Sequence, residues 1–99
     1  MDNPAPQTIA EAIGRVEEIL KQRNKPHGSF DDNARITCRF QAVIYAEEGW
    51  KRLTDVQALA LQMILHKVAR VLSGDPNFPD HWDDIAGYAT LVSNRLHHD

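Results

Sequence analysis

Residues 54–73 read TDVQALALQMILHKVARVLS, and this stretch decides the fold. Thr54 and Gln57 have the spacing of a capping box, in which two side chains satisfy free backbone N–H groups at a helix start. The apolar residues that follow recur at helical spacing, and they are Val56, Leu59, Ala60, Met63, Ile64, Val68 and Val71. Because they cover a broad face, we predict a central helix over residues 54–73 that contacts neighbours on more than one side.

Three further segments show the same helical period, and they predict helices over residues 8–23, 31–48 and 80–97. The first opens with a capping-box spacing at Thr8, and the second follows Asp31 and Asp32, either of which can act as its cap. Pro79 or Asp80 starts the last helix, since proline is favoured at a first helical position.

The chain as a whole is expected to form an all-α, single-domain bundle of about four helices, compact and with short connections. No segment alternates between apolar and polar residues over five positions, so no sheet is predicted. The domain should span residues 8–99. Residues 1–7, which include two prolines, are expected to be a disordered segment ahead of it.

Length and cysteine usage indicate a cytoplasmic protein. The chain has 99 residues, which suits one domain with one core. Cys38 is the only cysteine, so no intrachain disulfide can form and a reducing compartment is favoured. The N-terminus lacks the pattern of a signal peptide, and no apolar stretch approaches the roughly 18 residues of a membrane span. We therefore expect no membrane partner.

The charge distribution argues against polymeric nucleic acid as a partner. The net charge is −3, and residues 53–99 carry six acids against three bases, Lys67, Arg70 and Arg95. A surface that follows a phosphate backbone needs a basic stripe, and only the short cluster at residues 21–25 approaches one. A single nucleotide carrying Mg²⁺ stays compatible, because acids can hold the metal and a few bases suffice for phosphate.

Acidic residues gather at the start of the last predicted helix. Asp80, Asp84 and Tyr88 are four residues apart and share one helical face. One interpretation is structural, because carboxylates in a first turn are stabilised by the helix dipole. The other is a magnesium site held by Asp80 and Asp84 with Tyr88 beside it, since Mg²⁺ prefers oxygen ligands and keeps several waters.

Lys67 and Arg70 supply the complementary charge. A loop of about six residues makes helices 54–73 and 80–97 antiparallel neighbours, so these cations should lie beside Asp80 or Asp84. The cluster is then either a structural ion-pair clamp or a site in which Lys67 and Arg70 bind phosphate. Two other residues carry structural expectations: Gly87 should permit a close helix crossing or a ligand edge, and Cys38 should be a small core residue.

A block of motifs in the second half resembles a known family. It comprises HKVAR at residues 66–70, GDPN at 74–77 and DHWDDIAGYATL at 80–91. These motifs look like the K-x-x-R helix and the D-x-x-x-D-x-x-G-Y helix of a family of small phage and prophage helical proteins. Upstream, RNKPHGSF at residues 23–30 is similar to that family's R-x-x-x-Y-G-x-F loop, with His27 in place of tyrosine. Asp55 matches an acid that opens the K-x-x-R helix.

This family is similar in layout to nucleotide-modification-associated phage proteins and, more distantly, to MazG-like all-α nucleoside triphosphate pyrophosphatases. The resemblance implies nucleotide chemistry with Mg²⁺, and it adds His27, Asp55 and Tyr88 as candidate site residues. The chain departs from the MazG-like pattern, because Lys67 and Arg70 stand where the first acidic motif would fall.

Two hypotheses follow. The first is a protein that binds or hydrolyses a (deoxy)nucleotide, in the manner of a Mg²⁺-dependent pyrophosphohydrolase. The alternative is a non-enzymatic helical accessory protein whose charged cluster is structural. In either case the broad apolar helices make a homodimer an expected assembly.

Overall fold

The computed structural model describes residues 8–24 and 26–98, without the side chains of 20–24. The predicted disordered segment at residues 1–7 therefore lies outside the described residues. The elements are α1 (Ile9–Asn24), α2 (Phe30–Ala46), the short 3₁₀ helix η1 (Glu48–Arg52), α3 (Asp55–Ser73) and α4 (Pro79–His97). No strand occurs among the described residues, so the prediction of an all-α fold with four main helices is confirmed.

The helix starts follow local capping chemistry, and one of them differs from the prediction. At α3 the Thr54 hydroxyl accepts the Gln57 N–H at 3.1 Å, and the Gln57 side chain accepts the Thr54 N–H at 3.0 Å. The prediction that Asp31 or Asp32 caps the second helix is wrong. Ser29 is the cap, because its backbone is extended and its hydroxyl accepts the N–H of Asp32 at 3.1 Å.

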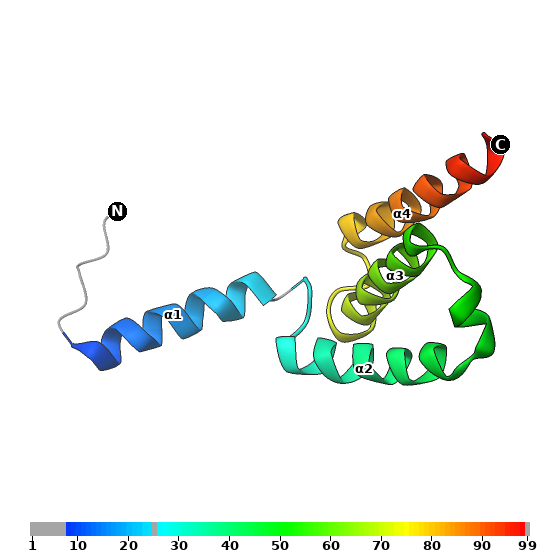
Figure 1. Ribbon diagram of the computed structural model, residues 1–99. Helices are drawn as coiled ribbons and strands as arrows, with labels where there is room; N and C mark the ends of the chain where they lie inside the picture. Colours follow the sequence, from blue (N-terminus) through cyan, green and yellow to red (C-terminus); the bar gives the residue numbers. More distant parts are fainter. Residues whose placement is uncertain (1–7, 25, 99) are drawn as a thin grey trace.

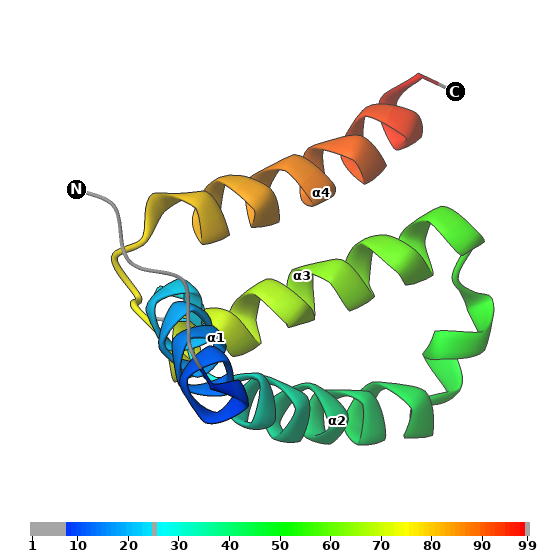
Figure 2. The ribbon, with the colours of Figure 1, turned by 90° about the vertical axis from the view of Figure 1, so that its left-hand side faces the viewer.

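Helix α3 is central, as its broad apolar face predicts. Figure 2 shows α3 lying between α2 and α4, with α4 running antiparallel to it. Two alanines on α3 are buried: Ala69 is 0% exposed and Ala60 is 6% exposed. Small side chains at these positions let the neighbouring helices approach α3 closely.

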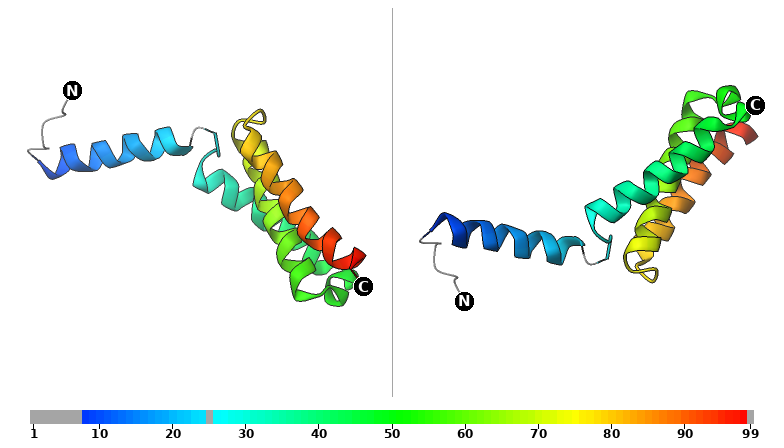
Figure 3. Two further views of the ribbon diagram at one scale, coloured as in Figure 1. Left: turned by 90° about the horizontal axis from the view of Figure 1, so that it is seen from above. Right: turned by 90° about the horizontal axis from the view of Figure 1, so that it is seen from below.

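Helix α1 stands apart from the other three. Figures 1 and 3 show it projecting away from the end of the α2–α4 unit. The radius of gyration is 18.5 Å, whereas a compact domain of this length has a radius of gyration of about 13 Å. The compact bundle expected from the sequence is therefore realised by α2, α3 and α4 alone. No described helix combines the length and the apolar character needed to cross a membrane.

The loop that links α1 to this unit is held against the end of α3. Gly28 has a positive φ of 77°, and a Cβ at this position would lie 2.7 Å from the carbonyl oxygen of Ser73. A Cβ at Gly74 would lie 2.6 Å from the backbone nitrogen of Gly28. The Pro26 carbonyl accepts the N–H of Asp75 at 3.0 Å. Two glycines thus allow two backbone segments to touch.

Replacing Gly28 with alanine should destabilise the fold by about 2–5 kcal/mol, because the left-handed backbone and the contact with Ser73 both disfavour a side chain. Gly87→Ala is the matched control, since a Cβ there would meet nothing within 4 Å. That variant should gain up to about 1 kcal/mol from helix propensity. Urea unfolding of the two variants checks this, and equal stability of Gly28→Ala and the wild type would contradict the contact.

Candidate functional site

An ion pair joins α3 to α4 at the position predicted from the sequence. Lys67 Nζ lies 2.9 Å from Asp84 Oδ2, and the side chains are 12% and 47% exposed. The hydrogen bond from Lys67 is the main reason that the pKa of Asp84 is lowered, and the charges of Lys67, His81 and Arg70 act in the same direction. The juxtaposition of Lys67 with Asp84 is therefore confirmed.

A buried histidine lies at the same junction. His81, on the first turn of α4, is 1% exposed. Its Nε2 is 3.1 Å from the Pro26 carbonyl oxygen and 3.3 Å from His27 Nδ1. Because a carbonyl oxygen can only accept, both contacts are satisfied when His81 Nε2–H donates and His27 Nδ1 accepts. Phe78 packs edge-on against both rings, at centroid distances of 5.3 and 5.0 Å.

The pKa of His27 depends on the charged side chains that lie near it. Its pKa is lowered, first by burial and then by the positive charge of His81, Arg70 and Lys67, while Asp80 opposes the shift. A partly buried imidazole among these cations is therefore held neutral. The structure thus gathers His27 from the loop, Lys67 and Arg70 from α3, and Asp80 and Asp84 from α4. We refer to these five residues as the charged junction.

Other predicted residues lie elsewhere. Asp55 opens α3, twelve residues before Lys67, so a helix rise places it about 18 Å away. Tyr88 lies one turn beyond Asp84, where it borders a shallow hollow with Gly87. Of the two expectations for Gly87, the close helix crossing is wrong, because nothing lies within 4 Å of an added Cβ, and the ligand edge stays a prediction. Cys38, expected in the core, is exposed.

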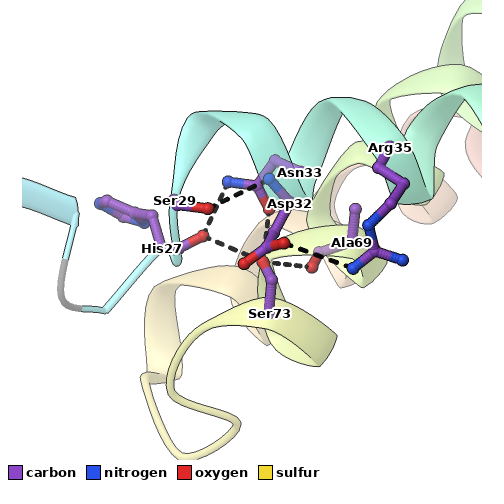
Figure 4. Close-up of polar contacts among 7 residues, drawn as sticks. All are labelled: His27, Ser29, Asp32, Asn33, Arg35, Ala69 and Ser73. Carbon is purple, nitrogen blue, oxygen red and sulfur yellow. Dashed lines mark hydrogen bonds and ion pairs between the residues drawn. The ribbon is translucent and has the colours of Figure 1, made fainter.

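A polar network that the sequence analysis did not predict supports the junction (Figure 4). The Asn33 amide donates to the His27 carbonyl at 2.8 Å. Ser73 Oγ lies 2.6 Å from Asn33 Oδ1 and 2.9 Å from the Ala69 carbonyl oxygen. These bonds fix the loop that carries His27 between α2 and α3.

The sequence carried a signal for the burial of His81 but not for the partners of Ser73. His81 precedes Ile85 by four residues and so lies on the apolar stripe of α4. The more hydrophobic neighbour Trp82 is instead 54% exposed, and its indole N–H donates to the Pro76 carbonyl at 2.8 Å. Asn33 and Ser73 are forty residues apart, and no local pattern connects them.

A groove beside the junction runs between α2 and α3. It has a volume of about 300 Å³. Arg70 and His66 line its α3 side, Phe30 lies at its α2 side and is 79% exposed, and three polar residues complete the α2 wall, Asn33, Thr37 and Gln41. Arg70 forms no ion pair with any residue that the structure describes. The groove therefore combines an unpaired guanidinium, an exposed aromatic ring and amide side chains.

Carboxylates at the junction can contribute only part of a metal site. Within residues 8–24 and 26–98, no three side chains of His, Cys, Asp or Glu are placed to share one metal ion. Asp80 and Asp84 are one turn apart on α4, and Asp84 is already engaged by Lys67. This pair suits a Mg²⁺ ion that keeps several waters and arrives on a phosphate group.

Comparison with known proteins gives a family but no activity. A family model described as a domain of unknown function, DUF6378, matches residues 11–96. No curated protein and no solved structure matches the chain.

The lowered pKa of His27 predicts a pH dependence of stability. The unfolded chain takes up the proton near the ordinary value of 6.5, whereas the folded chain takes it up only at lower pH. The contribution of neutral His27 to the free energy of unfolding should therefore be fully present above pH 6.5. It should be lost as pH falls from 6.5 through the folded pKa. Urea unfolding at several pH values should show a shallower slope for His27→Gln, while His98→Gln, at an exposed position, keeps the wild-type slope.

The ion pair predicts a different response on the acid side. Asp84 has a lowered pKa, so its contribution is present above the unfolded value of 3.8 and lost as pH falls through the folded pKa. At neutral pH, Asp84→Asn should lower the melting temperature by a few degrees, a modest effect because the carboxylate is half-exposed. Asp83→Asn, at an exposed neighbouring position, is the control. An equal melting temperature for Asp84→Asn and the wild type at neutral pH would count against a stabilising pair.

Proposed function

The chain belongs to the DUF6378 family, whose function is unknown, and we propose that it binds a (deoxy)nucleotide at the charged junction and the adjoining α2–α3 groove. The observation that carries this proposal is Arg70, a partly exposed arginine that forms no ion pair with a described residue. The resemblance to phage nucleotide proteins noted above points to the same chemistry.

Phosphate recognition is assigned to Arg70 and Lys67. A guanidinium presents a planar fork of donors that matches phosphate oxygens, and an ammonium acts as a compact point charge. Arg70 is within electrostatic reach of both His27 and Asp84, so it lies where the junction meets the groove. A phosphate at Arg70 would also approach Lys67, one helical turn away, which can keep its bond to Asp84.

Base recognition is assigned to the groove. The exposed ring of Phe30 offers a stacking surface, and stacking of a base on an aromatic ring contributes about 1–3 kcal/mol. The amides of Asn33 and Gln41 can pair with polar atoms of the base. The groove volume of about 300 Å³ lies at the lower end of the range for small-molecule sites, which suits a mononucleotide.

Magnesium would be held by Asp80 and Asp84 together with the phosphate and water. Asp80 is exposed, and its negative charge is close enough to oppose the lowering of the His27 pKa. It therefore lies in the same region as the cations. The charge of the metal would offset the negative charge of a triphosphate. Binding of the nucleotide does not require that a phosphoanhydride bond is broken.

Thermal unfolding with Mg²⁺ and each common ribo- and deoxynucleoside triphosphate tests the proposal. A ligand at 100 times its Kd stabilises the folded state by about 2.7 kcal/mol, so at least one nucleotide should raise the melting temperature by several degrees. Arg70→Gln should abolish that shift. Arg39→Gln, which removes an exposed arginine from α2, should keep it.

Two controls distinguish nucleotide binding from binding of phosphate alone and from hydrolysis. Inorganic phosphate with Mg²⁺ gives the response to phosphate alone, and release of phosphate or pyrophosphate reports hydrolysis. Absence of any shift with every nucleotide would overturn the proposal. The second candidate, a non-enzymatic helical interaction protein, would then be favoured, because many large apolar side chains of the described residues are exposed.

A further inference from the structure

The apolar stripe of α1 is uncovered. Ile9, Ile13, Val16 and Ile19 follow one face of the helix, and their exposed fractions are 81%, 52%, 55% and 54%. An isolated helix of this length is only marginally stable in water, and amphipathic helices gain their stability mainly from packing of the apolar face. The stripe therefore needs a surface to cover it.

The same chain carries an apolar groove that is also uncovered. It lies between α3 and α4, with a volume of about 420 Å³, and its lining includes Ala60, Leu61, Ile64, Ala89, Val92 and Leu96. Leu61 is 42% exposed and Leu96 is 60% exposed. Along α3 the lining runs from Gln57 to Ile64, which is about 10 Å of helix, and Leu53 lies just before α3. The α1 stripe from Ile9 to Ile19 is about 15 Å long, so the groove can take about two turns of it.

The total exposed area agrees with a missing partner. The accessible surface is 7744 Å², whereas a folded monomer of this mass exposes about 5,700 Å². The excess is about 2,000 Å². Seven residues of unfolded chain expose about 1,100 Å², so about 1,000 Å² of excess is left when that area is subtracted for residues 1–7. A standard protein interface buries about 800 Å² on each partner, so the excess is what one interface removes.

From these observations we propose that the protein is an arm-exchanged homodimer, in which α1 of each copy covers the α3–α4 groove of the other. The direction of α1 favours a second copy over the chain's own groove. The loop at residues 26–29 is tied to α2, α3 and α4 by His27, Asn33, Ser73 and His81, and α1 runs from this point away from α3 and α4 (Figure 3). A two-fold symmetric exchange covers two stripes and two grooves at once and leaves no open end.

The proposal does not depend on nucleotide binding, because the α3–α4 groove does not include Arg70, Phe30 or the acids of the charged junction. Failure of one proposal therefore leaves the other unaffected.

Cross-linking of paired cysteines tests the exchange directly. In a Cys38→Ser background, Val16→Cys on the stripe is combined with Val92→Cys in the groove, and a short bis-maleimide is added to the full chain. The expected product is a covalent dimer on a denaturing gel. A monomer with both thiols linked within one chain would show that α1 folds back on its own groove, and it would overturn the proposal. Absence of any link between the two positions would overturn it as well.

The control variant carries Glu18→Cys in place of Val16→Cys. Residue 18 lies on the opposite side of α1 from residue 16, so this pair should give much less covalent dimer.

Light scattering gives a second, independent readout. The wild-type chain should have twice the mass of the 11.2 kDa monomer. Ile13→Glu on the stripe and Leu96→Glu in the groove should each shift the population to the monomer, because each places a charge in the apolar interface. Glu18→Gln should leave the dimer intact. A wild-type chain that stays monomeric at high concentration would overturn the proposal, and so would dimers unaffected by both charged variants.

Discussion

The contact between the 26–29 loop and the end of α3 is the constraint on which the rest of the structure depends. Gly28 and Gly74 lack side chains at the point where the two backbones meet, so the Pro26 carbonyl can accept from both Asp75 and His81. This contact fixes the start of α2 and the turn into α4 relative to α3. The charged junction is assembled there because each of its residues lies within ten positions of this contact along the chain.

The sequence predicted the helices well, because their signals are local. Apolar spacing and the capping box of Thr54 and Gln57 act over three or four residues, and the structure contains both. The sequence also predicted that Lys67 lies beside Asp80 or Asp84, because two helices joined by a short loop pack antiparallel. Ser29 was missed as a cap because Asp31 and Asp32 offered the same chemistry two and three residues later.

The sequence could not predict how the helices pack over long distances. The stripe of α1 has the period of a core helix, yet it lies uncovered in the chain, because an apolar face does not specify which surface will bury it. The network of Asn33, Ser73 and His27 depends on residues tens of positions apart and has no local pattern. The roles of the candidate site residues depend on ligand chemistry, so no spacing rule could establish them.

The separation between bonded residues has a consequence for the order of folding. Packing of α2 on α3 and of α3 on α4 can begin beside the short linkers between them, so much of it closes only short loops and can form early. The His81 contacts to Pro26 and His27 instead join residues 55 and 54 positions apart. Closing so long a loop directly costs more chain entropy than closing a linker, so we expect these contacts to form after both helix pairs. Once formed, they hold the 26–29 loop and the start of α4 against the end of α3.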